Sequence, residues 1–362
     1  MLEMKPPLFV ACFLLAAITC GAHTCGKLRE IEKGDTCLSL SQALNLTLQD
    51  FMLLNPKTNC SSLIVGEEIC ASSCFRKLVS PRYGQRPVVM DYIGAMGNST
   101  AFDDVPVSPD VDHFFILSFA IDANRSGIVQ NGSFISYWSD GLTPESVSAI
   151  KSKHQNVKVL LSLAGYSLQV DGQSDPWIVR WYDPSDADLW IDNAVKSISA
   201  LVQKYHLDGV DIDYESMDDP SNLRLFPFCI GELIKALKRN KVISVATIAP
   251  YGASAPYYRS LLRYYGDQFD YINFQFYSYS NVTNAYDYVQ LYHWIAQGFD
   301  ENKLMVSLEI DGTSGRGVQG AEFFKAVEEI KKTRKVPGMF LWSAEGSQET
   351  GFLVEKVAQC TL

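Results

Sequence analysis

The sequence predicts an α/β protein: a (β/α)8 barrel of eight parallel strands, preceded by a small βααβ domain stapled by disulfides. Two observations predict the barrel. Eight apolar runs of strand length follow Pro87, and helix-period segments separate them. Near-continuous apolar strands are typical of a parallel sheet covered on both faces, and about 270 residues suit eight β/α repeats. One observation predicts the small domain: five cysteines lie within fifty residues near the N-terminus.

Residues 1–22 have the pattern of a secretory signal peptide. Lys5 is the one basic residue ahead of the apolar run from Leu8 to Cys20, and the small residues Gly21 and Ala22 follow. This run is too short to span a membrane, and no later segment is long enough. We therefore expect a secreted, extracellular protein that does not associate with a membrane.

The cysteine pattern agrees with an oxidising compartment. The crowded cysteines are Cys25, Cys37, Cys60, Cys70 and Cys74. Such crowding indicates disulfides in a small secreted domain, whereas a zinc site is disfavoured because the spacings lack a paired CxxC pattern. Five is odd, so one of them is free or pairs outside the group. The partners of Cys229 and Cys360 stay open. Six sequons are compatible with N-glycosylation: Asn45, Asn59, Asn98, Asn124, Asn131 and Asn281.

The small domain is expected over residues 23–75, as strand, helix, helix, strand. Residues 28–31 alternate as a strand, and a Gly-Asp-Thr turn at 34–36 leads into a helix over 37–44. Thr47 caps a second helix that ends before Pro56. Residues 63–70 form the second strand.

This pattern resembles a LysM module, a small βααβ fold that binds N-acetylglucosamine oligomers. The matching residues are Gly34, Asp35, Thr36, Asn55 and Pro56, together with the spacing of Leu63 and Gly66. The resemblance implies that those five residues contribute to sugar binding. A disulfide-stapled spacer is the alternative.

Residues 76–86 are basic and interrupted by Pro and Gly, as in a linker. Eleven extended residues reach roughly 35–40 Å, so the two domains can reorient independently. The barrel domain then runs over 87–362. Its expected strands are Val88–Gly94, Phe114–Ile121, Val157–Gly165, Gly209–Glu215, Ile243–Ala249, Tyr271–Ser278, Leu304–Ile310 and Met339–Ser343.

Helix signals lie between these strands. Residues 189–205 place their apolar side chains on one stripe, Thr143-Pro144 opens another helix, and residues 323–330 mark a third. A doubly wound sheet is the alternative fold, but no glycine-rich phosphate turn follows the first strand. The barrel is therefore the predicted fold.

Three acids stand out in the fourth strand. Asp211, Asp213 and Glu215 recur with a period of two, which puts their side chains on one face with Cα atoms about 6.6 Å apart. Burying three carboxylates costs several kcal/mol unless protons, hydrogen bonds or chemistry compensate. A solvated acidic turn is the alternative, but Val210 and Ile212 interleave with the acids as in a core strand. The pattern predicts a catalytic carboxylate array.

Residues 208–215 match the DGxDxDxE signature of the family 18 glycoside hydrolases, which include chitinases. The chain is similar to the plant class III and bulb-type chitinases of that family from about Pro87 to near its C-terminus. The resemblance implies hydrolysis of chitin by a retaining, substrate-assisted mechanism. In it, Glu215 is the general acid, Asp213 holds the N-acetyl group of the substrate, and Asp211 shares a proton with Asp213. Asp208 has the wrong parity for this face and is expected to be structural.

Other strand ends supply the remaining site residues that the resemblance implies. Tyr277 would donate a hydrogen bond to the N-acetyl carbonyl, and Gln275 is its inward partner on the sixth strand. Trp342 on the eighth strand matches a stacking floor for the sugar, and Tyr92 and Phe119 end the first two strands as further substrate contacts. The third strand departs from the family's SxGG pattern, because Ala164 replaces one glycine. That methyl group is tolerable if φ is negative there.

Composition limits the partners. The net charge of −10 disfavours nucleic acid, which needs a basic surface. The five histidines show no metal-ligand spacing, so we expect neither a metal nor a cofactor. The leading hypothesis is a secreted, monomeric endochitinase that binds chitin and N-acetylglucosamine oligosaccharides. The alternatives are a non-catalytic chitin-binding lectin or decoy, and a hydrolase of lipo-chitooligosaccharides or N-glycan cores.

Overall fold

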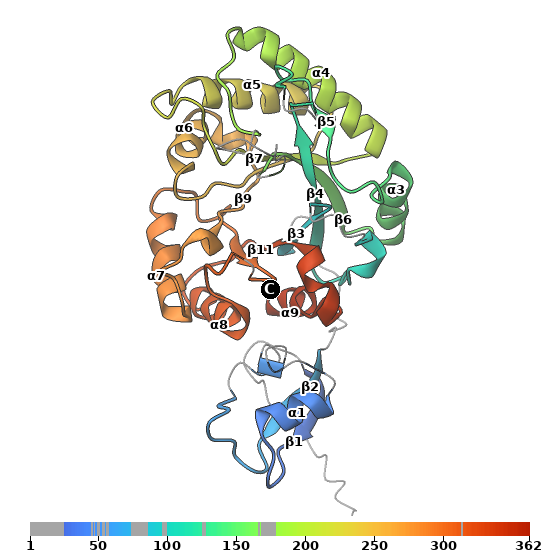
Figure 1. The fold of residues 1–362 in the computed structure, drawn as a ribbon, viewed down its shortest axis with the longest axis vertical. Helices are drawn as coiled ribbons and strands as arrows, with labels where there is room; N and C mark the ends of the chain where they lie inside the picture. Colours follow the sequence, from blue (N-terminus) through green and yellow to red (C-terminus); the bar gives the residue numbers. More distant parts are fainter. Residues whose placement is uncertain are drawn as a thin grey trace, which may run out of the picture.

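The computed structural model describes residues 25–44, 46, 48, 51–52, 55, 58–73, 86–95, 100–124, 128–165, 167, 179–312 and 314–362 (Figure 1). In the small domain, β1 (Cys25–Glu30) pairs antiparallel with β2 (Glu68–Ser73), and α1 (Cys37–Ala43) packs on them. The predicted disulfide staple is present: Cys37 bonds to Cys60 across 23 residues, and Cys70 is also disulfide-bonded.

One strand of the small domain is shorter than expected. The second strand begins at Glu68, because residues 63–66 form a turn. The Gly66 N–H ties the end of this turn to the carbonyl of Ile31, the residue after β1, at 2.8 Å. The backbone of Gly66 adopts φ +88°, which glycine accepts without steric cost. Residues 48, 51 and 52 are helical, as predicted, while Thr47 and Pro56 lie outside the described residues.

The barrel contains eight parallel strands: β3 (Val88–Ile93), β4 (Asp112–Ile121), β6 (Val157–Ala164), β7 (Gly209–Asp213), β8 (Val245–Ile248), β9 (Tyr271–Ile272), β10 (Val306–Glu309) and β11 (Gly338–Trp342). The sheet order runs from β10 through β11 and β3 to β9. The bridge from Ile272 to Leu304 joins β9 to the start of β10 and closes the ring. The short β5 (Ile135–Ser136) pairs antiparallel with the end of β4.

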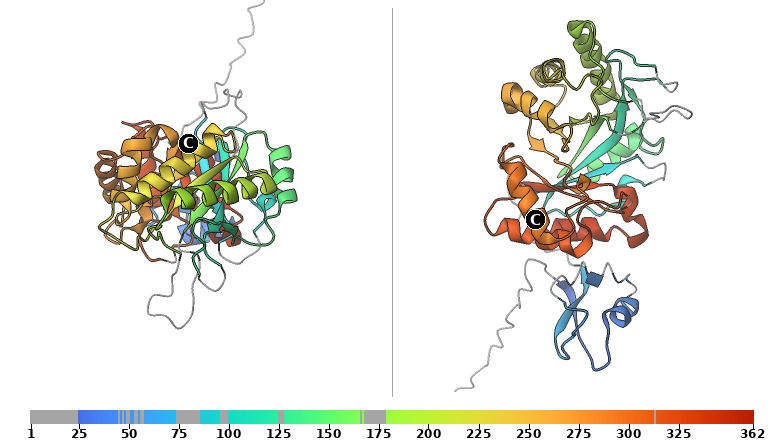
Figure 2. Two further views of the ribbon diagram at one scale, coloured as in Figure 1. Left: turned by 90° about the horizontal axis from the view of Figure 1, so that it is seen from above. Right: turned by 60° about the vertical axis from the view of Figure 1, so that its left-hand side comes forward.

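Helices surround the strands in Figures 1 and 2. They are α3 (Pro144–Lys153), α4 (Ala187–Tyr205), α5 (Leu225–Arg239), α6 (Ala255–Tyr265), α7 (Ala285–Ala296), α8 (Gly320–Lys331) and α9 (Leu353–Thr361). Thr143 caps α3 as predicted, with its hydroxyl accepting from the Ser146 N–H. None of the helices within the described residues combines the length and apolarity needed to cross a membrane.

Short 3₁₀ segments connect several of these elements: η1 (Phe102–Asp104), η2 (Gly266–Gln268), η3 (Phe276–Ser278) and η4 (Ala344–Thr350). Two strand predictions are corrected here. β7 ends at Asp213, so Glu215 lies two residues beyond the strand. β9 covers only residues 271–272, and the chain then leaves the sheet to form η3.

Among the described residues, two apolar clusters form the core of the barrel domain, and a third, which includes Leu40, Phe51 and Ile69, forms that of the small domain. In the barrel domain, the larger cluster fills the space between the strands and the helices, and the smaller one fills the interior of the barrel. The interior cluster comprises Val88, Met90, Tyr92, Phe114, Ile116, Leu160, Val245, Met305 and Phe340. Because a strand alternates its faces, the residues at 211 and 213 point inward with this cluster, and Val210 and Ile212 pack outward. The acids therefore face the inside of the barrel.

Asp208 has the structural position that its parity predicts. Its carboxylate accepts a hydrogen bond from the Val159 N–H (2.9 Å) and pairs with the Lys151 ammonium at 2.8 Å. It thereby ties the start of β7 to β6 and α3, at the end of the strand away from Glu215.

Candidate active site

The carboxylates lie where β7 meets the open end of the barrel. Asp211 and Asp213 are buried, and Glu215 is half-buried in the segment that follows the strand. Tyr258 of α6 fixes this segment from outside, since its hydroxyl donates to the carbonyls of Ile212 and Tyr214, both at 3.1 Å. Just beyond Glu215, a parallel bridge between Met217 and Trp181 also holds the chain, with the Trp181 N–H donating to the Ser216 carbonyl at 2.9 Å.

Asp211 is surrounded by hydrogen-bond donors. Its carboxylate accepts from the hydroxyls of Tyr92 (2.9 Å), Ser162 (2.7 Å) and Thr247 (2.5 Å), and from the amide of Asn273 at 3.3 Å. Burial raises the pKa of Asp211, and these four donors oppose that rise because they stabilise the charged form. The arrangement holds Asp211 in one orientation. Proton sharing with Asp213 stays a prediction.

Gln275 bridges the other two acids. Its side-chain amide donates to Asp213 (3.0 Å), to Glu215 (3.3 Å) and to the carbonyl of Ala249 at 3.1 Å. The sequence predicted Gln275 within the sixth strand, but β9 ends at Ile272 and Gln275 lies beyond it. The 3₁₀ turn that follows still directs its side chain to both carboxylates.

The electrostatics keep a proton in the site. Burial raises the pKa of Glu215 to about 7, with the Gln275 hydrogen bond opposing the shift. Burial and the charges of Glu215 and Asp211 raise the pKa of Asp213 well above its ordinary value. Burial likewise raises the pKa of Tyr277, followed by repulsion from Asp213 and Glu215, so its hydroxyl remains a donor. The site therefore contains a carboxylic acid near neutrality and a protonated phenol.

Aromatic side chains gather beside the carboxylates, around Tyr92, whose hydroxyl donates to Asp211. Trp342 is half-buried, and its ring stacks on Phe119 with centroids 5.8 Å apart and meets Tyr92 edge-on at 5.5 Å. Tyr92 and Phe119 are 1% and 3% exposed. The Tyr92 hydroxyl donates to Asp211 and the Phe119 ring stacks on Trp342, whereas Trp342 and Tyr277 keep exposed surface. The contacts of Tyr92 and Phe119 with substrate stay predictions.

Sequence reasoning missed the partners of Asp211. Ser162 and Thr247 occupy the positions paired with Asp211 on the two neighbouring strands, β6 and β8. Each is a polar residue inside an otherwise apolar run, which is the signal that could have identified them. Their pairing with Asp211 depends on the register between strands, and one chain does not reveal that register.

A glycine-rich loop supports Tyr277 from the side. Glu309, at the end of β10, accepts hydrogen bonds from the backbone and hydroxyl of Ser314. Gly317, in the same loop, lies so close that an added Cβ would be 2.7 Å from the Cα of Tyr277. Glu309 and this loop are therefore further site residues that the sequence did not indicate.

The third strand ends with an alanine in an unusual conformation. From the sequence, a methyl group is tolerable here only if φ is negative. Ala164 has φ +74°, so this condition is not met. An L-residue in this region costs about 1–2 kcal/mol because its Cβ approaches the following carbonyl. The next residue, Gly165 (φ +59°), abuts the ring of Phe119, where an added Cβ would be 2.2 Å from a ring carbon.

These two neighbours give opposite stability predictions. Ala164→Gly is expected to stabilise the protein by about 0.5–1 kcal/mol, since it relieves the positive φ at a modest entropic cost. Gly165→Ala is expected to destabilise it by about 2 kcal/mol or more, because the new methyl group displaces Phe119. Thermal unfolding of both variants by calorimetry tests this. A lower melting temperature for Ala164→Gly would contradict the assignment of strain to Ala164.

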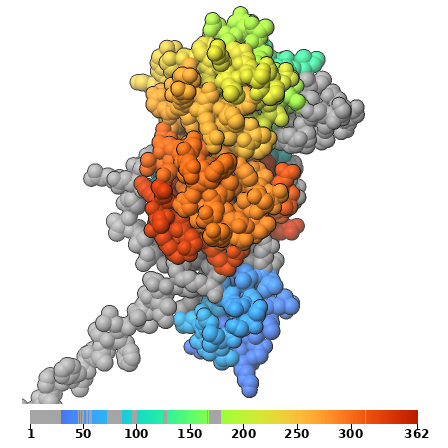
Figure 3. All heavy atoms as spheres, turned by 90° about the vertical axis from the view of Figure 1, so that its left-hand side faces the viewer, coloured from blue at the N-terminus to red at the C-terminus, as the bar shows by residue number. Residues whose placement is uncertain are grey.

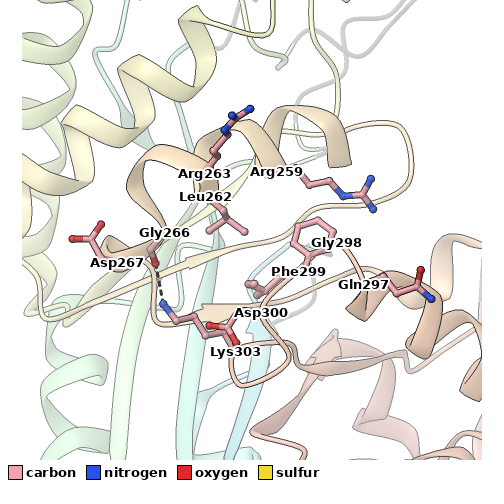
Figure 4. A pocket seen from close by; sticks show the side chains of 11 residues that line it. Arg259, Leu262, Arg263, Gly266, Asp267, Gln297, Gly298, Phe299, Asp300 and Lys303 are labelled. Carbon is pink, nitrogen blue, oxygen red and sulfur yellow. Dashed lines mark hydrogen bonds between the residues drawn. The ribbon is translucent and has the colours of Figure 1, made fainter.

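One cavity is distant from the acids. It has a volume of about 590 Å³, and its lining comes from α6 and from segments that precede β9 and β10, among them Arg259, Phe299 and Lys303 (Figure 4). Arg259 stacks on the Phe299 ring at 5.2 Å, and the Lys303 ammonium donates to the carbonyls of Gly266 and Phe269 at 2.8 Å. Segments that precede strands lie at the amino ends of the strands, whereas Glu215 follows the carboxyl end of β7. This cavity therefore lies outside the candidate site.

Comparisons with known proteins place this site in a family. Residues 88–358 match the model of the glycosyl hydrolases family 18, and residues 30–72 match the LysM domain. Chitinase 1 of Tulipa saxatilis subsp. bakeri is 40% identical over 265 residues, covering 72% of this chain and 81% of that protein.

Two crystal structures are similar to this fold. The catalytic domain of a family GH18 chitinase from the fern Peteris ryukyuensis is 40% identical, with a TM-score of 0.70, and covers 76% of this chain and 98% of its own. A family 18 chitinase from Crocus vernus is 34% identical, with a TM-score of 0.69, and covers 75% and 98%. With its closed barrel, its row of acids at the end of β7 and a family match over three quarters of its length, this chain belongs to family 18 of the glycosyl hydrolases.

Proposed function

We propose that this protein is a secreted chitinase that hydrolyses β-1,4-linked N-acetylglucosamine polymers with retention of the anomeric configuration. One observation carries the proposal: Glu215, with a pKa of about 7, shares the Gln275 amide with Asp213 at the open end of the barrel. A carboxylic acid that stays protonated near neutrality can donate its proton to a glycosidic oxygen. The named relatives support the substrate, since all three are chitinases.

The chemistry follows from the positions of three groups. Glu215 gives its proton to the leaving glycosidic oxygen as the bond to the anomeric carbon breaks. The N-acetyl oxygen of the same sugar attacks that carbon and forms an oxazolinium ion, whose charge Asp213 stabilises. Tyr277 donates its hydroxyl to the N-acetyl group and holds it for attack. Water then attacks the anomeric carbon and opens the oxazolinium ring. It gives a proton to the Glu215 carboxylate as it attacks, which restores the acid.

The alternatives have less support. A lectin or decoy on this barrel does not need the acid, whereas here Glu215 is retained and Gln275 holds it. A hydrolase of N-glycan cores or of lipo-chitooligosaccharides would use the same chemistry. The LysM match favours chains of N-acetylglucosamine over glycoproteins.

Activity should depend on pH through Glu215. Because burial raises its pKa to about 7, the acid form persists below that pH and is lost above it. We expect kcat/KM on a soluble chitin hexamer to fall about tenfold per pH unit above pH 7. In Gln275→Leu the maximal rate should fall and the alkaline limb should move to higher pH, since the amide that favours the carboxylate is gone. A decline that begins near pH 5 would contradict this assignment.

We propose that the small domain binds chitin through its exposed turns. Ile64 and Val65 are 65% and 62% exposed, in the turn that the Gly66 N–H ties to the Ile31 carbonyl. Asn55 and Thr36 also make hydrogen bonds within the domain, and their contact with sugar stays a prediction. The Asn55 side chain bonds to the backbone of Phe51 and Cys70, and Thr36 caps α1. These two residues shape the module, and the apolar turn supplies surface for sugar rings.

Point substitutions test this division of labour in the full chain. The double variant Ile64→Ser, Val65→Ser should adsorb several-fold less to colloidal chitin, because it loses apolar contact area. Its hydrolysis of a soluble hexamer should stay within twofold of wild type, since the carboxylates are untouched. Leu189→Ser, at an exposed site on α4, is the matched control and should change neither. Unchanged adsorption of the double variant would exclude this turn as the binding surface.

A further inference from the structure

A groove runs along the outer face of α7. Its volume is about 390 Å³, and its lining residues are Tyr279, Asn281, Val282, Asp287, Gln290, Leu291 and Trp294. The α7 region forms part of the orange surface turned toward the viewer in Figure 3. None of Asp211, Asp213, Glu215 and Tyr277 lines this groove, although Tyr279 follows Tyr277 by two residues in the segment between β9 and α7.

The helix supplies a regular wall to this groove. Asp287, Gln290 or Leu291, and Trp294 follow one another at helical spacing and span two turns, about 10 Å. The opposite face of α7 is buried through Tyr288 and Tyr292. Trp294 nevertheless has 57% of its surface exposed. Among the described residues, more than half of the Trp294 side chain is therefore left uncovered.

An N-glycosylation sequon opens into the same groove. Asn281-Val282-Thr283 lies in the turn before α7, with Asn281 exposed and Val282 buried. Asn284 then caps the helix by accepting from the Asp287 N–H at 3.0 Å. The Val282 N–H also donates to the Tyr279 carbonyl at 3.3 Å, so backbone hydrogen bonds hold the chain around Asn281, and Asn281 itself lines the groove that contains Trp294.

We propose that Asn281 carries an N-linked glycan whose first N-acetylglucosamine residues fill this groove and cover Trp294. The inference rests on the secretion proposed above, because the modification is made in the secretory pathway. The Asn281 amide nitrogen loses a proton and bonds to C1 of the first sugar. The bond from C1 to the diphosphate of a lipid-linked oligosaccharide breaks, and the lipid diphosphate leaves with the electron pair and accepts the proton.

The groove suits this occupant chemically. The apolar face of a sugar ring can cover Trp294 and Leu291, and the amide of Gln290 and the carboxylate of Asp287 can bond to hydroxyl and N-acetyl groups. Attachment at Asn281 places the sugar beside the groove at a high effective concentration, so weak contacts suffice.

The test uses the full chain secreted from eukaryotic cells. Peptide mass spectrometry should find a glycan on Asn281, and Thr283→Ala should remove it while leaving the asparagine in place. Hydroxyl-radical footprinting should then show Trp294 oxidised several-fold faster in Thr283→Ala and Asn281→Gln than in wild type. Tyr286, 71% exposed on the same helix and absent from the groove lining, is the internal control and should not change.

The possible outcomes separate this inference from the proposed function. Wild type, Thr283→Ala and Asn281→Gln should hydrolyse a chitin hexamer at the same rate. If none of the three hydrolyses it, that result counts against the proposed function and leaves the inference about the glycan unaffected. An unmodified Asn281, or equal oxidation of Trp294 with and without the glycan, would overturn the inference. Protection of Trp294 in Asn281→Gln only after adding free chitin oligomers would also overturn it and identify the groove as a site for the polymer.

Discussion

Replacing Glu215 with glutamine is expected to lower kcat on a soluble chitin hexamer by about 10²–10⁴-fold. The amide has nearly the shape of the carboxylic acid but cannot give a proton to the glycosidic oxygen. Because the Gln275 amide and the Asp213 carboxylate remain in place, oligomer binding should stay within a few-fold of wild type. Steady-state kinetics and calorimetric titration of the hexamer measure the two quantities separately.

A neighbouring acid provides the matched control. Asp208 belongs to the same motif but pairs with Lys151 and the Val159 N–H at the other end of β7. Asp208→Asn should therefore lower the melting temperature and leave kcat within about twofold. If Glu215→Gln turns over the hexamer near the wild-type rate, or if the two variants lose the same activity, Glu215 is not the acid.

The apolar runs and the helix-period segments between them predicted most of the barrel, because a strand buried on both faces is apolar along its whole length. Each of the eight apolar runs contains a strand, and the alternation in β7 correctly placed Asp211 and Asp213 on the inner face. Such inferences use only local information, because the apolar residues that mark a strand buried on both faces are consecutive in the sequence.

The sequence could not predict features that depend on contacts between distant segments. Gln275 reaches the acids although β9 stops at Ile272, because the turn after it sets the direction of the side chain. Thr247 and Ser162 meet Asp211 through strand register. The positive φ of Ala164 likewise has no signature in the residue itself, since alanine is rare in that conformation.

The proposed mechanism makes the substrate's acetamido group indispensable. A chitin hexamer should be cleaved, whereas the glucose hexamer with the same linkage should be cleaved at least about 10³-fold more slowly, because it lacks the oxygen that attacks the anomeric carbon. The Tyr277 hydroxyl, held protonated in the site, would also lose its acceptor. Loss of both interactions acts on the transition state and should lower kcat rather than binding alone.

Proton NMR of the freshly formed products tests the same step independently. Attack by the N-acetyl oxygen and then by water inverts the anomeric carbon twice, so the new reducing ends should appear first as the β anomer and mutarotate afterwards. A thiazoline that mimics the oxazolinium ion should inhibit the wild-type protein competitively. The alternative is that Asp213 forms a bond to the sugar itself, which would also give retention. In that case the glucose hexamer would be cut at a comparable rate and the thiazoline would bind weakly, so the two substrates and the inhibitor together distinguish the two mechanisms.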